Sequence, residues 1–175
     1  VEFLVDQNKN FYFIEVNPRL QVEHPVTEIV YGIDLVEKQI RIAQGEKLEL
    51  KQKNIKPQGW AMEFRICAED PKKNFQPGTG KIKNYFLPGG KGVEIHTFLQ
   101  PNQIIFPYFD NLIAKLVIWG NNRKHCILRA RRAFEEFSIE GVPTLIPLFK
   151  SIIKNQNFVN GKISTSFIED EKIVE

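Results

Sequence analysis

The feature that most constrains the fold of this chain is a short apolar strand that runs directly into a polar segment. Residues 11–16 read Phe-Tyr-Phe-Ile-Glu-Val, and this aromatic and β-branched pattern with a single charge is typical of a buried strand. Side chains alternate along a strand, so Glu15 and Asn17 project to the same side. Pro18 favours an extended backbone at Asn17. The strand therefore presents two oxygen-bearing side chains together at its end.

Carboxylate and amide oxygens in this position indicate a site for a hard divalent cation. Mg²⁺ and Mn²⁺ prefer such ligands, and magnesium is commonly held by one or two carboxylates together with substrate phosphates. A structural ion pair between Glu15 and Arg19 explains the same spacing equally well. The strand end by itself leaves both interpretations open.

The longer sequence around the strand end favours a catalytic site. Residues 15–28 read Glu-Val-Asn-Pro-Arg-Leu-Gln-Val-Glu-His-Pro-Val-Thr-Glu, and residues 59–71 read Gly-Trp-Ala-Met-Glu-Phe-Arg-Ile-Cys-Ala-Glu-Asp-Pro. Both resemble signature segments of the biotin carboxylases, which are ATP-grasp enzymes. The Glu-x-Asn core alone resembles ATP-grasp ligases in general. Segments 76–82 and 107–116 also match in order and approximate spacing, so the resemblance covers nearly the whole chain.

The resemblance implies an α+β fold with an antiparallel sheet and helices. Residues 1–45 are expected to form the end of an ATP-grasp domain, and residues 46–175 the biotin carboxylase C-terminal domain. The two parts are expected to form one compact unit, because 175 residues with 42% hydrophobic content can bury one sizeable core.

Hydrophobic periodicity predicts the elements of this fold. Asp34 is expected to cap a helix that ends at Gly45. The strand over residues 60–67 has one apolar face and a second face that carries Glu63 and Arg65. The other predicted elements are a hairpin of residues 1–5 and 11–16, strands over 80–86, 92–97 and 112–119, and helices over 123–137, 143–154 and 166–170.

The resemblance assigns metal-binding roles to the first residues of the chain. Glu2 and Glu15 resemble the carboxylates that bind the metal ions bridging the phosphates of ATP, and Asn17 completes this set. Their chemistry agrees with this role, since Mg²⁺ or Mn²⁺ neutralises charge that develops on a transferring phosphoryl group. ATP and the metal ion are therefore expected cofactors.

The residues after Pro18 resemble the part of the site that handles bicarbonate. Arg19, Gln21 and the backbone amide of Val22 resemble the bicarbonate-binding group, and a guanidinium can hold a planar oxyanion through two parallel hydrogen bonds. Glu23 resembles the general base that deprotonates bicarbonate before its attack on the γ-phosphate. A surface ion pair between Glu23 and Arg19 is the alternative.

Arg65 resembles the residue that stabilises the enolate-like oxygen of biotin after the ring nitrogen loses its proton. This makes Arg65 both a catalytic and a cofactor-binding candidate. An ion pair with Glu63 or Glu69 on the strand is the alternative.

Four other features of the matched segments receive no chemical role. His24 precedes a proline in an expected tight loop and stays unassigned. Asp110 and Lys115 match the family sequence, but packing in the core or in a dimer explains them equally well. The aromatic segment 106–109 is expected to pack.

Composition restricts which partners and which cellular compartment are expected for this chain. The net charge of +3 is spread along the chain, so nucleic acid is not required as a partner. We find no apolar run of about 18 residues and no leader pattern, and expect neither a membrane span nor a signal peptide. Cys67 and Cys126 fit neither a metal pair nor a disulfide framework, which favours a reducing, cytoplasmic location.

The resemblance also implies the reaction. A biotin carboxylase converts ATP, bicarbonate and biotin on a carrier into carboxybiotin, ADP and phosphate, through carboxyphosphate. The implied partners are a biotin carboxyl carrier protein or domain, a carboxyltransferase component and a second copy in a homodimer. The final acceptor stays open among acetyl-CoA, pyruvate and propionyl-CoA.

One feature of the chain limits the activity expected of it. The Gly-rich loop, the lysines and the N-terminal domain that precede the Glu-x-Asn strand in the resembled family are missing, so we expect little or no turnover by these 175 residues alone. Two alternatives remain: another ATP-grasp ligase, or a non-catalytic module that uses a basic helix face around Arg129, Arg131 and Arg132.

Overall fold

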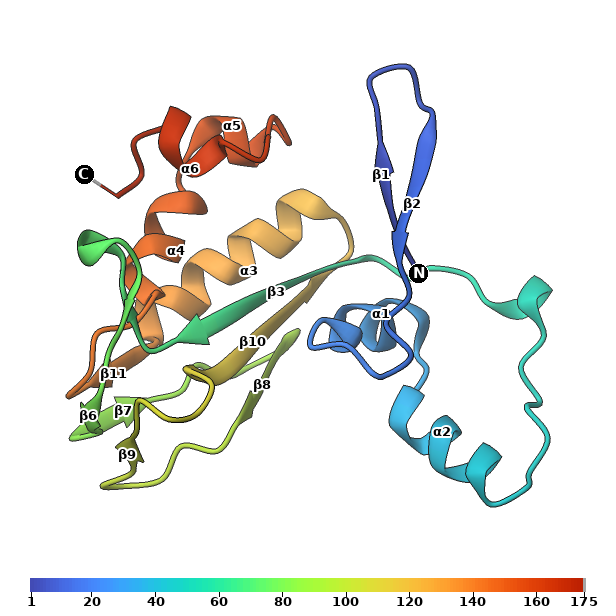
Figure 1. Ribbon diagram of the computed structural model, residues 1–175, viewed down its shortest axis with the longest axis horizontal. Helices are drawn as coiled ribbons and strands as arrows, with labels where there is room; N and C mark the ends of the chain where they lie inside the picture. The colour runs from blue at the N-terminus through green and yellow to red at the C-terminus, as the bar shows by residue number, and fades with distance from the viewer. Residues whose placement is uncertain (175) are drawn as a thin grey trace.

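The computed structural model describes residues 1–174, and its main elements form a hairpin, a helix-covered sheet and a C-terminal group of helices (Figure 1). The hairpin consists of β1 (Glu2–Val5) and β2 (Phe11–Glu15). The three-stranded antiparallel sheet has the order β3-β10-β8. The longer elements that follow the hairpin are α1 (His24–Tyr31), α2 (Leu35–Ala43), β3 (Trp60–Cys67), β8 (Val93–Thr97), β10 (Leu112–Gly120), α3 (Arg123–Glu136) and α4 (Ile146–Ile152).

Short elements complete the chain. Three two-stranded ladders, β4-β5, β6-β9 and β7-β11, surround one end of the sheet. The short elements are η1 (Gln52–Asn54), β4 (Glu69–Asp70), η2 (Pro71–Lys73), β5 (Gln76–Pro77), β6 (Gly80–Lys81), β7 (Asn84–Phe86), β9 (Ile104–Ile105), β11 (Ser138–Glu140), α5 (Gln156–Val159) and α6 (Phe167–Asp170).

The β1–β2 hairpin projects away from the rest of the molecule (Figure 1). The Asp6 carboxylate closes its turn by accepting hydrogen bonds from the backbone amides of Asn8 and Asn10, both at 2.8 Å. The ring of Phe3 packs edge-on against Phe11 and Phe13, with centroids 5.7 and 6.1 Å apart. All residues of both strands remain exposed, so cross-strand pairing holds the hairpin without a covering layer.

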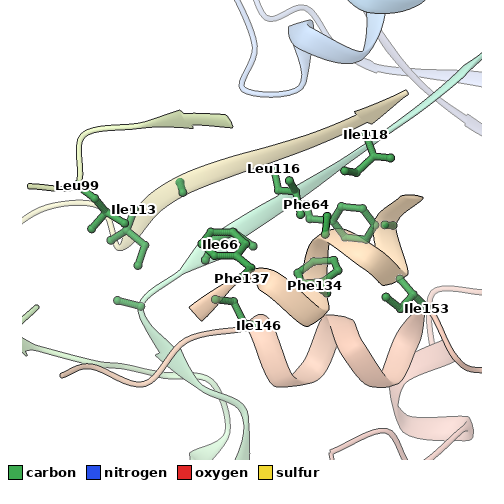
Figure 2. Packing of buried hydrophobic residues seen from close by; sticks show 14 of the residues in the cluster. Phe64, Ile66, Leu99, Ile113, Leu116, Ile118, Phe134, Phe137, Ile146 and Ile153 are labelled. Carbon is green, nitrogen blue, oxygen red and sulfur yellow. The ribbon is translucent and has the colours of Figure 1, made fainter. Parts of the chain in front are cut away.

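The core lies between the β3-β10-β8 sheet and α3 (Figure 2). Alternate residues of β3, Phe64 and Ile66, point toward α3 and are 5% and 0% exposed. Phe64 meets Phe134 of α3 edge-on, with ring centroids 5.0 Å apart. Phe149 of α4 packs on the same ring at 5.3 Å. Apolar burial on this face therefore fixes β3 and its register with β10.

The opposite face of the sheet carries charged residues and contacts α1. Arg65 of β3 lies opposite Lys115 of β10 in the ladder, and Glu63 lies opposite Val117. Helix α1 packs against β3 and β10, and its residue Pro25 is fully buried. The sheet therefore has an apolar side toward α3 and a polar side toward the segment that leads into α1.

Most predicted elements are confirmed. The hairpin, the helix capped by Asp34 and the strand with Glu63 and Arg65 on one face are present, and the Asp34 carboxylate accepts from the Glu37 amide at 2.7 Å. Strands at 93–97 and 112–120 and helix α3 also match. The single strand predicted over 80–86 is wrong, because β6 and β7 pair with different partners, β9 and β11.

One local expectation is wrong. His24 does not lie in a tight loop; it begins α1, and Pro25 occupies the first turn, where a proline costs no helical hydrogen bond. The aromatic segment 106–109 does not pack into the core of this chain, since Tyr108 is 84% and Phe109 77% exposed, so packing in a dimer stays a prediction. Short loops next to proline carry too little periodicity to show where their side chains point.

Three arginines of α3 donate hydrogen bonds to backbone carbonyl oxygens of the same chain. Arg129 donates to the carbonyl oxygen of Trp119 at 2.6 Å, Arg131 to that of Ile153 at 3.1 Å and Arg132 to that of Gly89 at 2.8 Å. These bonds argue against a free basic face on α3. No helix in the stretch 1–174 is both long and apolar enough to cross a membrane.

Candidate functional site

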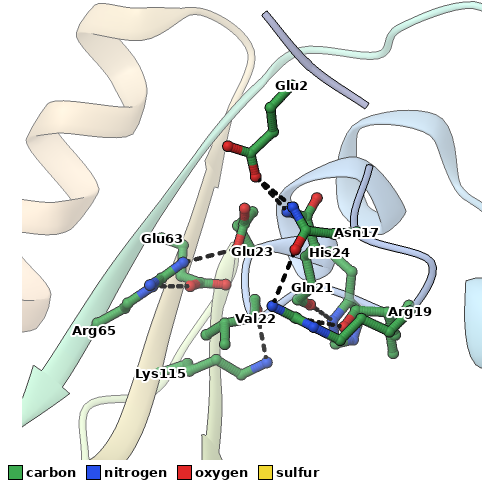
Figure 3. A network of polar contacts seen from close by, with 11 residues as sticks. Glu2, Asn17, Arg19, Gln21, Val22, Glu23, His24, Glu63, Arg65 and Lys115 are labelled. Carbon is green, nitrogen blue, oxygen red and sulfur yellow. Dashed lines mark hydrogen bonds and ion pairs between the residues drawn. The ribbon is translucent and has the colours of Figure 1, made fainter. Parts of the chain in front are cut away.

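The predicted metal ligands come together at the base of the hairpin, where Figure 3 shows Glu2 facing Asn17. Glu2 of β1 lies opposite Glu15 of β2 in the ladder. The Asn17 side-chain nitrogen donates to Glu2 at 2.7 Å and to Glu15 at 3.1 Å. The strand alternation that predicted a shared direction for Glu15 and Asn17 is thus confirmed. Two carboxylates and one amide converge on a single point.

The donor set at this point fits a divalent cation held jointly with a phosphate ligand. Within residues 1–174, no group of three or more histidine, cysteine, aspartate or glutamate side chains is placed to hold a metal. The two carboxylates Glu2 and Glu15 are nevertheless the number that magnesium uses where substrate phosphates supply further ligands. Such a cation would replace the Asn17 amide hydrogens between the two carboxylates.

The segment after Asn17 turns sharply and places the predicted bicarbonate ligands. The Arg19 amide donates to the Asn17 carbonyl oxygen at 2.8 Å, and the Arg19 guanidinium reaches the Asn17 side-chain oxygen at 3.4 Å. Gln21 donates to Glu2 at 3.2 Å. The side-chain amide of Gln21 therefore connects the group of predicted metal ligands to the segment that carries Val22 and Glu23.

An ion pair joins this segment to the sheet. Arg65 of β3 donates through Nη2 to Oε2 of Glu23 at 2.7 Å, although the two residues are 42 positions apart. Their side chains are 51% and 52% exposed, and ion pairs of this kind contribute about 0–1 kcal/mol. The pair is therefore weak enough for a bound anion to separate, which would free both groups.

Two residues without a predicted role support this site. Lys115 donates from Nζ to the carbonyl oxygen of Val22 at 3.1 Å and so fixes the segment before α1 on β10. Glu63 lies 3.6 Å from the Arg65 Nε atom through its Oε1 oxygen. Pairing the strands 60–67 and 112–119 in register would have placed Lys115 beside Arg65 from the sequence.

Glu63 is much more deeply buried than Glu23, and this burial changes the pKa of its carboxyl. Burial raises the pKa of the Glu63 carboxyl above its ordinary value; the charges of Lys115 and Arg65 oppose this shift, and that of Glu23 adds to it. Burial also raises the pKa of the Cys67 and Cys126 thiols to about 11, so neither is a nucleophile at neutral pH.

A cleft opens beside the segment 19–24, which carries the predicted bicarbonate ligands. It has a volume of about 670 Å³ and lies between the segment 19–24, helices α1 and α2 and the exposed connection 48–57. Arg19, Gln21 and Glu23 all line it. A small anion can thus reach these three side chains from solvent.

Two family models match separate parts of the chain. Residues 63–170, more than half of the chain, match the biotin carboxylase C-terminal domain. Residues 1–51 match the ATP-binding domain of the carbamoyl-phosphate synthase L chain. The fold and site therefore define an ATP-grasp domain end that continues into a carboxylase C-terminal domain.

Individual relatives show which family within this class the chain resembles. Biotin carboxylase 1 of Bacillus subtilis is 47% identical over 97% of this chain, and the propionyl-CoA carboxylase alpha chain of mouse is 46% identical over the same share. The crystal structure of the biotin carboxylase domain dimer of Hydrogenobacter thermophilus 2-oxoglutarate carboxylase, with MgADP and bicarbonate, superposes over 99% of the chain with a TM-score of 0.96 at 44% identity. The chain belongs to the biotin carboxylase family.

The chain spans only part of these relatives. It covers 38% of the Bacillus subtilis protein, 24% of the mouse protein and 38% of the Hydrogenobacter chain. The family and the α+β fold predicted from the sequence are confirmed, while the division at residue 45 and the role of each site residue stay predictions.

Proposed function

We propose that this chain is the C-terminal part of a biotin carboxylase, which uses ATP and bicarbonate to carboxylate biotin on a carrier. One observation carries the proposal: the Arg65–Glu23 ion pair of 2.7 Å brings the residue expected at biotin to the residue expected at bicarbonate. The alternative of a plain strand-face ion pair does not require that Glu23 also line a cleft with Arg19 and Gln21.

Arg19, Gln21 and the amide of Val22 bind bicarbonate in this proposal. The guanidinium of Arg19 offers two parallel donors to a planar anion, and Gln21 adds an amide donor from the next turn of chain. Lys115 holds the Val22 carbonyl at 3.1 Å, and this bond fixes the backbone on the C-terminal side of the residue whose amide faces the anion.

Glu23 takes the proton of bicarbonate, and Arg65 stabilises the oxygen of biotin. An ionised carboxylate within hydrogen-bond reach can accept the proton as bicarbonate attacks the γ-phosphate of ATP. The fixed cation of Arg65 then faces negative charge that develops on biotin, which is the preorganised electrostatic stabilisation that enzymes use most. Both groups must leave their mutual ion pair to act.

Glu2 and Glu15 hold the metal ion, Mg²⁺ or Mn²⁺, that accompanies ATP, and Asn17 joins them by turning its side-chain oxygen, which accepts from Arg19 in this structure, toward the ion. The ion supplies neutralisation of phosphate charge when bound. Because these residues lie on the hairpin and its exit, their separation is set by β1–β2 pairing rather than by the sheet.

The partners follow from the proposed reaction. They are a biotin carboxyl carrier protein or domain, a carboxyltransferase component and a second copy in a homodimer, in the cytoplasm. The relatives act in different carboxylases, for 2-oxoglutarate and propionyl-CoA by their names, so the final acceptor of this chain is not assigned.

Bicarbonate-dependent ADP release, measured with and without free biotin, tests the proposal. The chain joined to its upstream coding region should respond to biotin, and the 175-residue chain alone should be silent. Arg65→Ala should abolish the response. Arg41→Ala is a matched control, since Arg41 is 50% exposed and pairs with Glu37 at the same 2.7 Å. ADP release that ignores biotin would instead indicate another ATP-grasp ligase.

A further inference from the structure

Glu63 lies almost fully out of solvent on the site face of β3. Its side chain is 5% exposed. Its Oε2 atom is buried and accepts no hydrogen bond from any of the residues 1–174. A buried oxygen that has lost its water without gaining a partner is destabilising, and a carboxylate more so than an amide. The carboxylate at this position therefore needs a reason other than stability.

The neighbours of Glu63 supply that reason. Its Oε1 atom faces the Nε edge of Arg65 at 3.6 Å, and the two residues alternate with Phe64 on the same strand. Lys115 of β10 stands beside Arg65 in the ladder, so two cations share this acid. Burial raises the pKa of Glu63, whereas both cations oppose that shift.

The guanidinium of Arg65 is thus held at two different edges (Figure 3). Its Nη2 edge binds Glu23, a half-exposed carboxylate on a segment that also lines the cleft. Its Nε edge faces Glu63, which is buried and fixed to the sheet. A ligand can displace the first partner because exposed ion pairs are weak, whereas the second partner is buried and stays in place.

We propose that Glu63 is a positioning residue for Arg65, which it holds at Nε while the Nη2 edge leaves Glu23 for the negatively charged oxygen of the substrate. This inference rests on the proposed function of the chain. The same step releases Glu23 to accept the bicarbonate proton. Glu63 itself touches no substrate and acts only through the guanidinium.

A double-mutant cycle on the enzyme with its upstream region tests this role. The readout is the ratio of ADP release with biotin to that without it, in wild type, Glu63→Gln, Arg65→Lys and the double variant. Glu63→Gln should lower the ratio at least tenfold. In the Arg65→Lys background, which keeps a cation but lacks Nε, the same change should lower it less than twofold. Glu136→Gln, a partly exposed acid paired with Arg132 at 2.7 Å, should change nothing.

Three outcomes would overturn the inference. One is an unchanged ratio in Glu63→Gln, and another is an equal loss from this change in both Arg65 backgrounds. Wild-type ADP release that ignores biotin would overturn the proposed function and this role with it. Glu63→Asp, which keeps the charge but shortens its reach, should retain part of the biotin response. The Glu63→Asp variant provides a second test if Glu63→Gln folds poorly.

Discussion

The β1–β2 hairpin and the β3-β10-β8 sheet use similar strand sequences with opposite results. Both are rich in aromatic and aliphatic residues, yet Phe13 in β2 is 63% exposed, whereas Phe64 in β3 is 5% exposed and Leu116 in β10 is fully buried. The difference is the layer of helices α3 and α4 that covers the sheet. Apolar strand residues contribute stability only where a second layer removes them from water.

This difference divides the proposed site into two parts. The proposed metal ligands Glu2 and Glu15 lie on the hairpin, which is tied to the following segment through Asn17 and Gln21. Glu23 and Arg65 lie where α1 meets the covered sheet. The residues proposed to handle bicarbonate and biotin are therefore anchored on the core, and those proposed to bind the metal are not.

Truncating one aromatic ring in each region gives the largest expected contrast. Phe134→Ala removes a fully buried ring that packs on Phe64 and should lower the free energy of unfolding by about 3–5 kcal/mol. Phe13→Ala, at an exposed hairpin position, should lower it by less than about 0.5 kcal/mol. Urea denaturation followed by circular dichroism measures both. Equal losses would mean that the hairpin folds as part of the core.

Removing the Lys115 ammonium should loosen the connection between the two regions. Lys115→Met cuts the hydrogen bond to the Val22 carbonyl, and bonds of this charged kind contribute about 1.5–3 kcal/mol. Amide hydrogen exchange should accelerate in residues 19–24 while β10 stays protected. The exposed Lys124→Met serves as the control. If exchange in residues 19–24 does not change, Lys115 does not hold this segment.

The side-chain caps of two helices test the same contrast, since each accepts a hydrogen bond from a backbone amide of the first turn. Asn122 accepts from the His125 amide at 2.9 Å and caps α3, which carries core residues; Asn122→Ala should cost about 1 kcal/mol of global stability. Asp34 caps α2, which has no buried residue. Asp34→Ala should fray residues 35–38 in hydrogen exchange and leave the denaturation midpoint in place. A shift of that midpoint would show that α2 folds together with the sheet.

The sequence predicted those parts of the fold that local patterns determine. Alternation fixed the two faces of β3, and a turn of polar residues fixed the hairpin. It also predicted that Glu15 and Asn17 share a direction, because their spacing within one strand determines this. Helix α1 was missed because its proline at the second position resembles a loop signal.

The remaining part of the site depends on contacts that no local pattern contains. The Glu23–Arg65 pair joins residues 42 positions apart, and the Lys115–Val22 bond joins residues 93 apart. The burial of Glu63 depends on how α1 covers the sheet, which the alternation along β3 leaves open. Long-range packing therefore decides which charged residues meet, while strand alternation only decides which face they share.

The smallest expected effect concerns Glu63, a buried acid of the covered sheet. Burial raises the pKa of Glu63, so the folded chain binds a proton there at a higher pH than the unfolded chain does. The resulting penalty is present at neutral pH and disappears as the pH falls through the ordinary Glu range near ~4.3. Glu63→Gln should therefore be slightly more stable than wild type at pH 7.5, and this advantage should shrink on acidification.

Thermal unfolding of the wild type and Glu63→Gln between pH 7.5 and 4 measures this difference. The charge of His24 also acts on Glu63, so wild type and Glu63→Gln are compared again in a His24→Gln background. Glu136→Gln on α3 should show no such trend, because that acid is partly exposed rather than buried. A pH-independent difference between wild type and Glu63→Gln would mean that Glu63 titrates alike in both states. The sheet would then lose no stability at this acid, and the contrast with the hairpin would reduce to apolar burial alone.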